Sequence, residues 1–268
     1  MMDWELYLQA LILVSIAAVL PWIYSIIRKD VSIVDSLWSL FFLMIAAIYA
    51  LSTQTLAERG WLVFALVAVW SLRLSAYITV RNHGEPEDYR YQTIRANNEP
   101  AFWFKSFYIV FLLQSTLAWI ISLPLLAAIT SRAELGLLDA VALLLFAIGL
   151  VFEAGGDYQL SRFKANPANA GKVLNTGLWQ FTRHPNYFGN ACIWWSFYLF
   201  AASSGAWWSI IAPLLMTFLL LKVSGVAMLE RTIVDRRPEY AEYIQQTNAF
   251  FPGPKRSADL SEEGVKNA

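Results

Sequence analysis

The feature that most restricts this chain is a series of long apolar segments. Inside a bilayer the backbone polar groups find no water, so segments that cross it must be helices or closed barrels. These segments are long and apolar on all sides, which favours helices. Seven windows approach the roughly 20 apolar residues that cross a bilayer: 5–27, 32–51, 60–80, 105–130, 136–158, 187–202 and 206–229. The sequence therefore predicts an all-α, polytopic integral membrane protein with seven transmembrane helices.

Positive charge is distributed unevenly between the connecting segments. Arg59 and Arg132 lie in the alternate connections, and sixteen of the 20 lysine and arginine residues fall in segments 28–31, 81–105, 161–185 and 230–268. By the positive-inside rule, this places the N-terminus outside and the C-terminus in the cytoplasm. We expect one membrane domain over residues 1–251. The composition of residues 252–268 is that of a disordered tail.

Composition argues against several kinds of partner and site. The formal net charge is zero, which gives no reason to expect a nucleic-acid partner. Cys192 is the single cysteine, so an internal disulfide and a multi-thiolate metal site are excluded. Two histidines without an HExxH pattern make a histidine metal site unexpected. Neither GxGxxG nor GxxxxGK[ST] occurs, which argues against a soluble-type nucleotide fold.

Ionisable residues inside the predicted spans are costly and usually mark function. They are Asp35, Arg73, Glu153, Asp157 and Lys222. At ~1.5 Å per residue, Asp35 lies roughly 6 Å inside the second span, and Tyr77 roughly 6 Å from the end of the third. We expect most of them to line one polar cavity open to the cytoplasm. The alternatives are helix capping by Asp35, ion pairing for assembly, and the usual enrichment of tyrosine at membrane interfaces.

The two long cytoplasmic segments carry candidate anion ligands. "EPEDYRY" (85–91) combines Asp88, Arg90 and Tyr91, which suits charge-assisted hydrogen bonds and phosphate binding. In the second segment, Pro185 is placed to begin a helix, whose N-terminus suits an anion. The basic candidates there are Arg162, Lys164, Arg183 and His184, and Glu230 and Arg231 follow the last span. The alternative for both segments is a solvated surface.

Three motifs give the chain a family resemblance. "VDSLW" (34–38), "RLSAYITVRNHGEPEDYRY" (73–91) and "RHPNYFGN" (183–190) resemble the bacterial branch of the membrane steroid 5α-reductase-like proteins. That superfamily also contains sterol C14-reductases and isoprenylcysteine carboxyl methyltransferases. "RHPNY" alone does not separate reductase from methyltransferase, but the first two motifs favour the reductase. The resemblance implies a location in the bacterial inner membrane with an active site open to the cytoplasm.

The resemblance implies an NADPH-dependent steroid 5α-reductase that reduces the C=C bond of a hydrophobic enone, such as a 3-oxo-Δ4 steroid or a lipid. Tyr77 is then the donor to the substrate carbonyl, with Asp35 accepting from it or protonated in an apolar site. The family's Gln and Glu pair on the second helix is absent, and Asn190 stands where the family has Glu. The implied cofactor-binding residues are Asn186, Asp157, Lys164, Arg162, Arg183, His184, Tyr187, Asn190, Glu230, Arg231, Arg90, Tyr91 and Asp88.

Two other functions remain open from the sequence. An S-adenosylmethionine-dependent membrane lipid or prenyl-thiol methyltransferase would share the "RHPNY" motif. A transporter is disfavoured by the odd number of spans, the lack of visible inverted repeats and the confinement of polar groups to one half of the membrane.

Overall fold

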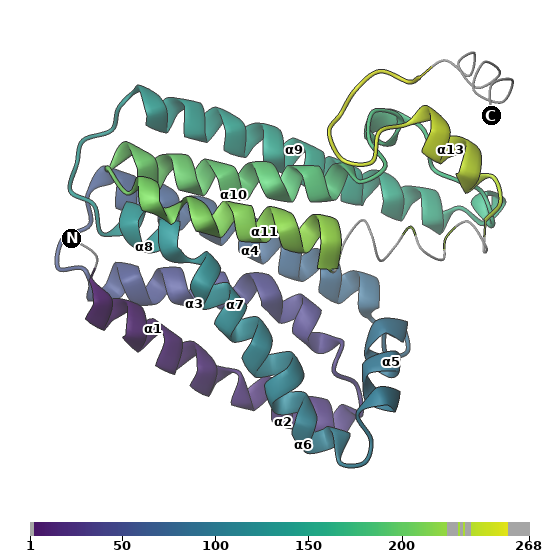
Figure 1. Ribbon diagram of the computed structural model, residues 1–268, viewed down its shortest axis with the longest axis horizontal. Helices are drawn as coiled ribbons and strands as arrows, with labels where there is room; N and C mark the ends of the chain where they lie inside the picture. Colours follow the sequence, from purple (N-terminus) through teal and green to yellow (C-terminus); the bar gives the residue numbers. More distant parts are fainter. Residues whose placement is uncertain (1–2, 224–229, 231–232, 234–236, 257–268) are drawn as a thin grey trace, which may run out of the picture. The chain divides into compact units, whose positions relative to one another are not determined.

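The computed structural model describes residues 3–223, 230, 233 and 237–256, and this part of the chain is helical without a strand (Figure 1). The first half comprises α1 Trp4–Ala17, α2 Val19–Arg28, α3 Ile33–Ser52, α4 Glu58–Asn82, α5 Tyr89–Asn97, α6 Phe102–Ser106, the π-helix η1 Phe107–Leu112, α7 Leu113–Ile121 and α8 Leu123–Ile129. The second half comprises α9 Leu137–Ala165, the 3₁₀ helices η2 Pro167–Asn169 and η3 Gly177–Gln180, α10 Pro185–Ser203, the 3₁₀ helix η4 Trp207–Ile210, α11 Ile211–Phe218, the π-helix η5 Leu219–Val223 and α13 Tyr240–Gln246. The predicted all-α class is confirmed.

Among the described residues, five helical stretches are long and apolar enough to cross a membrane. They are Trp4–Arg28, Ile33–Ser52, Glu58–Asn82, Phe102–Ile121 and Leu137–Ala165. These correspond to the first five predicted spans. The sixth window lies within α10, and the seventh begins with the shorter apolar helix Trp207–Val223. Residues 224–229, which complete the seventh window, lie outside the described residues, as do residues 257–268 of the predicted tail.

Prolines account for two breaks in the described apolar helices, at Ala18 and Ser122. Pro21 lies in the first turn of α2, just after the break at Ala18, and Pro124 lies in the first turn of α8, just after the break at Ser122. A proline has no N–H to donate to the preceding turn, and its ring crowds the carbonyl four residues earlier. The chain therefore restarts a helix at each proline.

The chain forms two compact units, residues 1–139 with 197–212 and residues 140–196 with 213–268. In the first unit, α3 and α4 pack along their length, and the Ser39 hydroxyl of α3 donates to the Ser71 carbonyl of α4 at 2.9 Å. The core beside this contact includes Phe42 and Trp70, whose ring centroids are 5.8 Å apart. This packing fixes the end of α3 that carries Asp35.

One end of the first unit is tied together by a fully buried arginine. Arg59, in the first turn of α4, donates from Nε to Asp139 Oδ1 at 2.7 Å and from Nη2 to Asp139 Oδ2 at 2.8 Å. Its remaining donors reach the Ser131 and Ser203 hydroxyls and the carbonyls of Ala133 and Glu134. Arg59, which the sequence placed in a connection between spans, is therefore a buried ion-pair partner in the first turn of α4.

In the second unit, glycines allow α9 and α10 to approach closely. A methyl group on Gly189 of α10 would lie 2.4 Å from the Gly149 carbonyl oxygen and 2.4 Å from the Glu153 nitrogen of α9. Because backbone atoms cannot give way, only glycine fits at this crossing. Pro185 is the first residue of α10, as the sequence predicted. The close approach brings the polar residues on the two helices within hydrogen-bonding range.

Candidate functional site

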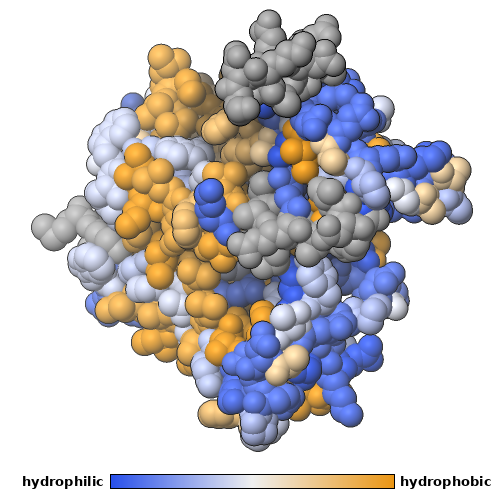
Figure 2. All heavy atoms as spheres, turned by 45° about the vertical axis from the view of Figure 1, so that its right-hand side comes forward, coloured by the Kyte–Doolittle hydropathy of each residue, from blue (hydrophilic) through white to orange (hydrophobic). Residues whose placement is uncertain are grey.

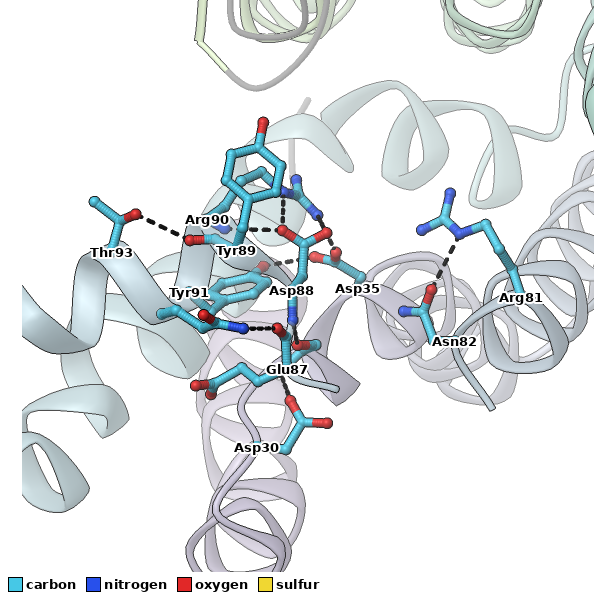
Figure 3. Close-up of polar contacts among 12 residues, drawn as sticks. Asp30, Asp35, Arg81, Asn82, Glu87, Asp88, Tyr89, Arg90, Tyr91 and Thr93 are labelled. Carbon is cyan, nitrogen blue, oxygen red and sulfur yellow. Dashed lines mark hydrogen bonds and ion pairs between the residues drawn. The ribbon is translucent and has the colours of Figure 1, made fainter. Parts of the chain in front are cut away.

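The clearest polar cluster of the first unit surrounds Asp35, on the first turn of α3 (Figure 3). Tyr91 donates from its hydroxyl to Asp35 Oδ1 at 2.5 Å, and Arg90 donates from Nη2 to Asp35 Oδ2 at 2.6 Å. Both partners come from α5, a helix within the segment 81–105, for which the sequence predicted no helix. Asp35 therefore forms an ion pair with Arg90 within a polar cluster.

Local sequence explains why α5 begins where it does. Asp88 caps the helix by accepting from the Arg90 N–H at 2.9 Å, and it also accepts from Arg90 Nε at 2.9 Å. Burial alone would raise the pKa of Asp88, but the hydrogen bonds from Arg90 outweigh it and lower the pKa below its usual value. Arg90 therefore lies between two carboxylates, Asp88 and Asp35.

Two further contacts tie the start of α5 to the residues before α3. The Asp88 N–H donates to the Ser32 hydroxyl at 2.8 Å, and the Val31 N–H donates to Glu87 at 2.9 Å. Glu87 also pairs with Arg95, in the last turn of α5, at 2.7 Å. These bonds hold the helix in the orientation in which Arg90 and Tyr91 reach Asp35.

The Tyr91 hydroxyl is buried and satisfied on both sides. It donates to Asp35 and accepts from Gln114 Nε2 at 3.1 Å. Burial, with the adjacent Asp35 charge, holds the pKa of Tyr91 well above its usual value of 10, so the phenol is neutral at pH 7. Gln114 is the second residue after η1, and π-helical segments often occur at functional sites. Gln114 was not foreseen, although a single amide in an apolar segment was the available signal.

The tyrosine on Asp35 is thus Tyr91 and not the expected Tyr77. Ser71 and Ser75 lie on the buried face of α4, where the Ser71 carbonyl meets α3. Tyr77 follows Ser75 by two residues, which turns its side chain roughly 200° from that face at 3.6 residues per turn. Its ring instead lies 5.8 Å from the Arg81 guanidinium, one turn further along α4. The role of Tyr77 as the donor to the substrate carbonyl stays a prediction.

In the second unit, amides of α10 meet carboxylates of α9 in two successive pairs. Asn190 donates from Nδ2 to Glu153 at 2.8 Å, and Asn186 donates from Nδ2 to Asp157 at 3.1 Å. Glu153 and Asp157 are each 3% exposed. The structure therefore pairs Asn186 with Asp157 and Asn190 with Glu153, and all four residues were singled out from the sequence.

Arg183 and His184 have a different role from the expected phosphate ligands. Arg183 donates to both oxygens of Glu230, at 2.7 and 2.9 Å, and its other nitrogen reaches the Ile244 and Thr247 carbonyls. His184 Nε2 lies 2.9 Å from Glu230. Arg183 is 6% exposed and His184 4%. These contacts hold Glu230, Ile244 and Thr247 against the start of α10. The expected cofactor contact at Arg231 lies outside the described residues.

The remaining candidates lie near the end of α9 and the start of α10. Arg162 and Lys164 are exposed in the last turn of α9, and the Arg162 guanidinium lies 6.0 Å from the Tyr158 ring. Tyr187 stacks on His184 with ring centroids 5.5 Å apart. Among the described residues, no group of three or more His, Cys, Asp or Glu side chains is arranged to hold a metal ion.

Comparison with known proteins places the chain in a family. The profile described as "Protein of unknown function (DUF1295)" matches residues 21–247, which include every candidate above. The chain belongs to the DUF1295 family. This is a family of membrane steroid 5α-reductase-like proteins, and its description assigns no activity.

One curated protein is similar to most of the chain, and a second is similar to a short part of it. An uncharacterised protein of Schizosaccharomyces pombe is 28% identical over 277 residues, covering 92% of this chain and 79% of the relative. A probable O-methyltransferase of Ustilaginoidea virens, ustE, is 44% identical over 48 residues, covering 18% of this chain and 17% of the relative. No solved structure matches the chain significantly.

Proposed function

We propose that this protein is a membrane oxidoreductase that uses NADPH to reduce the C=C bond of a hydrophobic enone, such as a 3-oxo-Δ4 steroid. The observation that carries the proposal is the hydrogen bond of 2.5 Å between the buried Tyr91 hydroxyl and Asp35. Enone reduction needs a hydrogen-bond donor at the substrate carbonyl, and a tyrosine hydroxyl beside an acid can supply one. Membership in a 5α-reductase-like family supports the same reaction.

The reaction requires a hydrogen-bond donor because reduction at the β-carbon leaves negative charge on the carbonyl oxygen. A donor in place before the reaction is typically worth ~3–4 kcal/mol of transition-state stabilisation. Tyr91 carries its proton at pH 7 as an ordinary phenol does, and burial raises its pKa further. Its single proton is directed to Asp35, so it serves the carbonyl after the hydroxyl turns from Asp35. Tyr77 of α4, the donor that the family resemblance implies, is the second candidate.

The chemistry of the second unit fits a nicotinamide dinucleotide. Arg162 and Lys164 are exposed cations suited to its phosphates. Asn190 Oδ1 is buried and accepts no hydrogen bond from the described residues, so it can accept from an N–H of the cofactor. We assign the pairs Asn186–Asp157 and Asn190–Glu153 to orienting these contacts. NADPH, when bound, supplies the hydride.

We further propose the complete topology that the charge distribution indicates. Seven spans, with α10 and the helix that begins at Trp207 as the sixth and seventh, place the N-terminus outside and the candidate residues toward the cytoplasm. Sixteen basic residues in alternate connections support this orientation. The bacterial inner membrane is the location that the family resemblance favours.

The test is cofactor binding followed by turnover. Detergent-purified protein is titrated with NADPH, NADH and S-adenosylmethionine, and NADPH oxidation is then followed with a panel of hydrophobic enones. We expect NADPH binding, and a 10²–10³-fold loss of rate when the carbonyl donor is removed, as for the loss of one oxyanion donor. Tyr91→Phe, Tyr77→Phe and Asp35→Asn identify the donor. Wild-type rates in all three variants, or an enzyme that binds no NADPH, would refute the proposal.

The second candidate is an S-adenosylmethionine-dependent methyltransferase acting on a membrane lipid or prenyl thiol. The observation in its favour is the 44% identity over 48 residues to a probable O-methyltransferase. Saturable binding of S-adenosylmethionine without binding of NADPH, followed by methyl transfer to a lipid acceptor, would establish it.

A further inference from the structure

The first unit contains a cavity that the candidate reductase residues do not use. Its volume is about 360 Å³, at the lower end of the range for small-molecule sites. It lies between the end of α2, the end of α5 and the start of α6. Its lining includes Ser25, Lys29, Arg95, Glu99, Phe102 and Trp103. A cavity of this size suits a polar headgroup and not a whole lipid.

Charges of both signs lie at this cavity. Lys29 and Glu99 are exposed, and neither side chain has an ion-pair or hydrogen-bond partner among the described residues. Arg95 already has two partners, because it pairs with Glu87 at 2.7 Å and its guanidinium lies 4.5 Å from the Phe102 ring. The available groups are therefore one ammonium and one carboxylate.

The surface beside the cavity is apolar. Ile27 of α2 is 74% exposed, and Trp103 and Phe104 of α6 are 57% and 53% exposed. In the lower part of Figure 2, where α5 lies, hydrophilic residues gather next to hydrophobic surface. Ile27 and Trp103 lie in stretches apolar enough to cross a membrane. A ligand whose head enters the cavity would thus have its tail against lipid-facing side chains.

We propose that this cavity binds the zwitterionic headgroup of an aminophospholipid with the chemistry of phosphatidylethanolamine. Lys29 pairs with the phosphate, and Glu99 accepts N–H bonds from the ammonium. The hydroxyls of Ser25 and Ser106, both 1% exposed, donate to carbonyls of their own helices and keep oxygen lone pairs for the headgroup.

The Glu99 carboxylate is expected to favour phosphatidylethanolamine over lipids with the other common headgroups. A quaternary ammonium has no N–H to donate to Glu99, and the Phe102 face that could attract it already carries Arg95. An anionic glycerol headgroup would meet Lys29 favourably but would meet Glu99 with like charge. Only the primary ammonium satisfies both groups. A bound lipid would also stabilise the end of α5, whose first turn carries Arg90 and Tyr91.

The experiment is native mass spectrometry of the full-length protein in detergent, titrated with phosphatidylethanolamine, phosphatidylcholine and phosphatidylglycerol of identical acyl chains. We expect preferential retention of phosphatidylethanolamine, by about fivefold over each competitor. Glu99→Gln should abolish that preference, and Lys29→Gln should weaken binding of both phosphatidylethanolamine and phosphatidylglycerol. Glu85→Gln and Lys255→Gln, which change the same charges at exposed positions elsewhere, are the matched controls.

Free phosphoethanolamine distinguishes the lipid from a soluble ligand of the same chemistry. Displacement of the lipid only at a large excess of phosphoethanolamine supports the lipid, and displacement at equal concentration overturns it. Equal retention of the three lipids by the wild type, or an unchanged preference in Glu99→Gln, would also overturn the proposal. Lipid binding and enone turnover are separate readouts, so failure of one leaves the other standing.

Discussion

Replacing Arg59 by methionine is expected to lower the free energy of unfolding by about 3–5 kcal/mol, the usual cost of removing one partner from a buried ion pair. The guanidinium is fully buried and bidentate on Asp139. Methionine fills similar space but removes every donor. Asp139, which is 3% exposed, would then keep only the Ser203 hydroxyl at 2.6 Å and the Gly136 N–H at 2.8 Å as donors among the described residues.

A second variant tests whether the unpaired Asp139 carboxylate causes the loss of stability. Arg59→Met/Asp139→Asn should be more stable than Arg59→Met by roughly 1 kcal/mol or more, because a buried neutral amide costs less than a buried unpaired carboxylate. A simple loss of packing at Arg59 would give no such recovery. The order of stability, wild type above double variant above Arg59→Met, is thus specific to electrostatics.

The measurement is equilibrium unfolding in mixed micelles with increasing dodecyl sulfate, followed by tryptophan fluorescence, since the chain has 12 tryptophans. Arg132→Met is the matched control, because Arg132 is exposed in the same connection as Ser131. It should change stability by less than about 0.5 kcal/mol. If Arg59→Met unfolds within 1 kcal/mol of wild type, or if the double variant is the least stable of the three, the reasoning fails.

Three shorter predictions concern the contact between α9 and α10, the Asp35 cluster and the contact of Glu230 with Arg183 and His184. Gly189→Ala should cost about 1–3 kcal/mol in unfolding experiments, because its methyl group would lie 2.4 Å from the Glu153 nitrogen; Gly136→Ala, with no atom nearer than 4.0 Å, is the control. Gln114→Leu should lower enone turnover less than Tyr91→Phe does, and equal losses would contradict a positioning role. Burial opposes the lowering of the Glu230 pKa, but His184 and Arg183 bring it to about 2 from 4.5. Stability from this contact should therefore be complete above pH 4.5 and lost toward pH 2, and Glu230→Gln should remove that acid-dependent loss.

Some of the candidate site could be predicted because local patterns determine it. The start of α10 at Pro185 followed from the preference of proline for the first helical position. Asn186 and Asn190 were recognisable because amides one turn apart share a helix face. The sequence did not show which carboxylates these amides contact. Their partners, Asp157 and Glu153, lie 29 and 37 residues away, and the contacts depend on the close approach of α9 and α10 at Gly189.

The partner of Asp35 shows the same limit. Spacing within α4 suggested Tyr77 at the right depth, but depth along a helix does not give the direction of a side chain relative to another helix. The structure supplies Tyr91 from α5, because Asp88 caps a helix in a segment rich in charge that carried no apolar periodicity.

Apolar length and composition determined by themselves that this chain is helical and suited to a membrane, because a bilayer accepts few other backbone arrangements. The same information identified which residue types were unusual enough in that setting to carry chemistry. Only the tertiary structure decided how they pair: Asp35 with Arg90 and Tyr91, Arg183 and His184 with Glu230, and Arg59 with Asp139. Pairing depends on side-chain direction and on contacts distant in sequence, and neither is encoded in a local pattern.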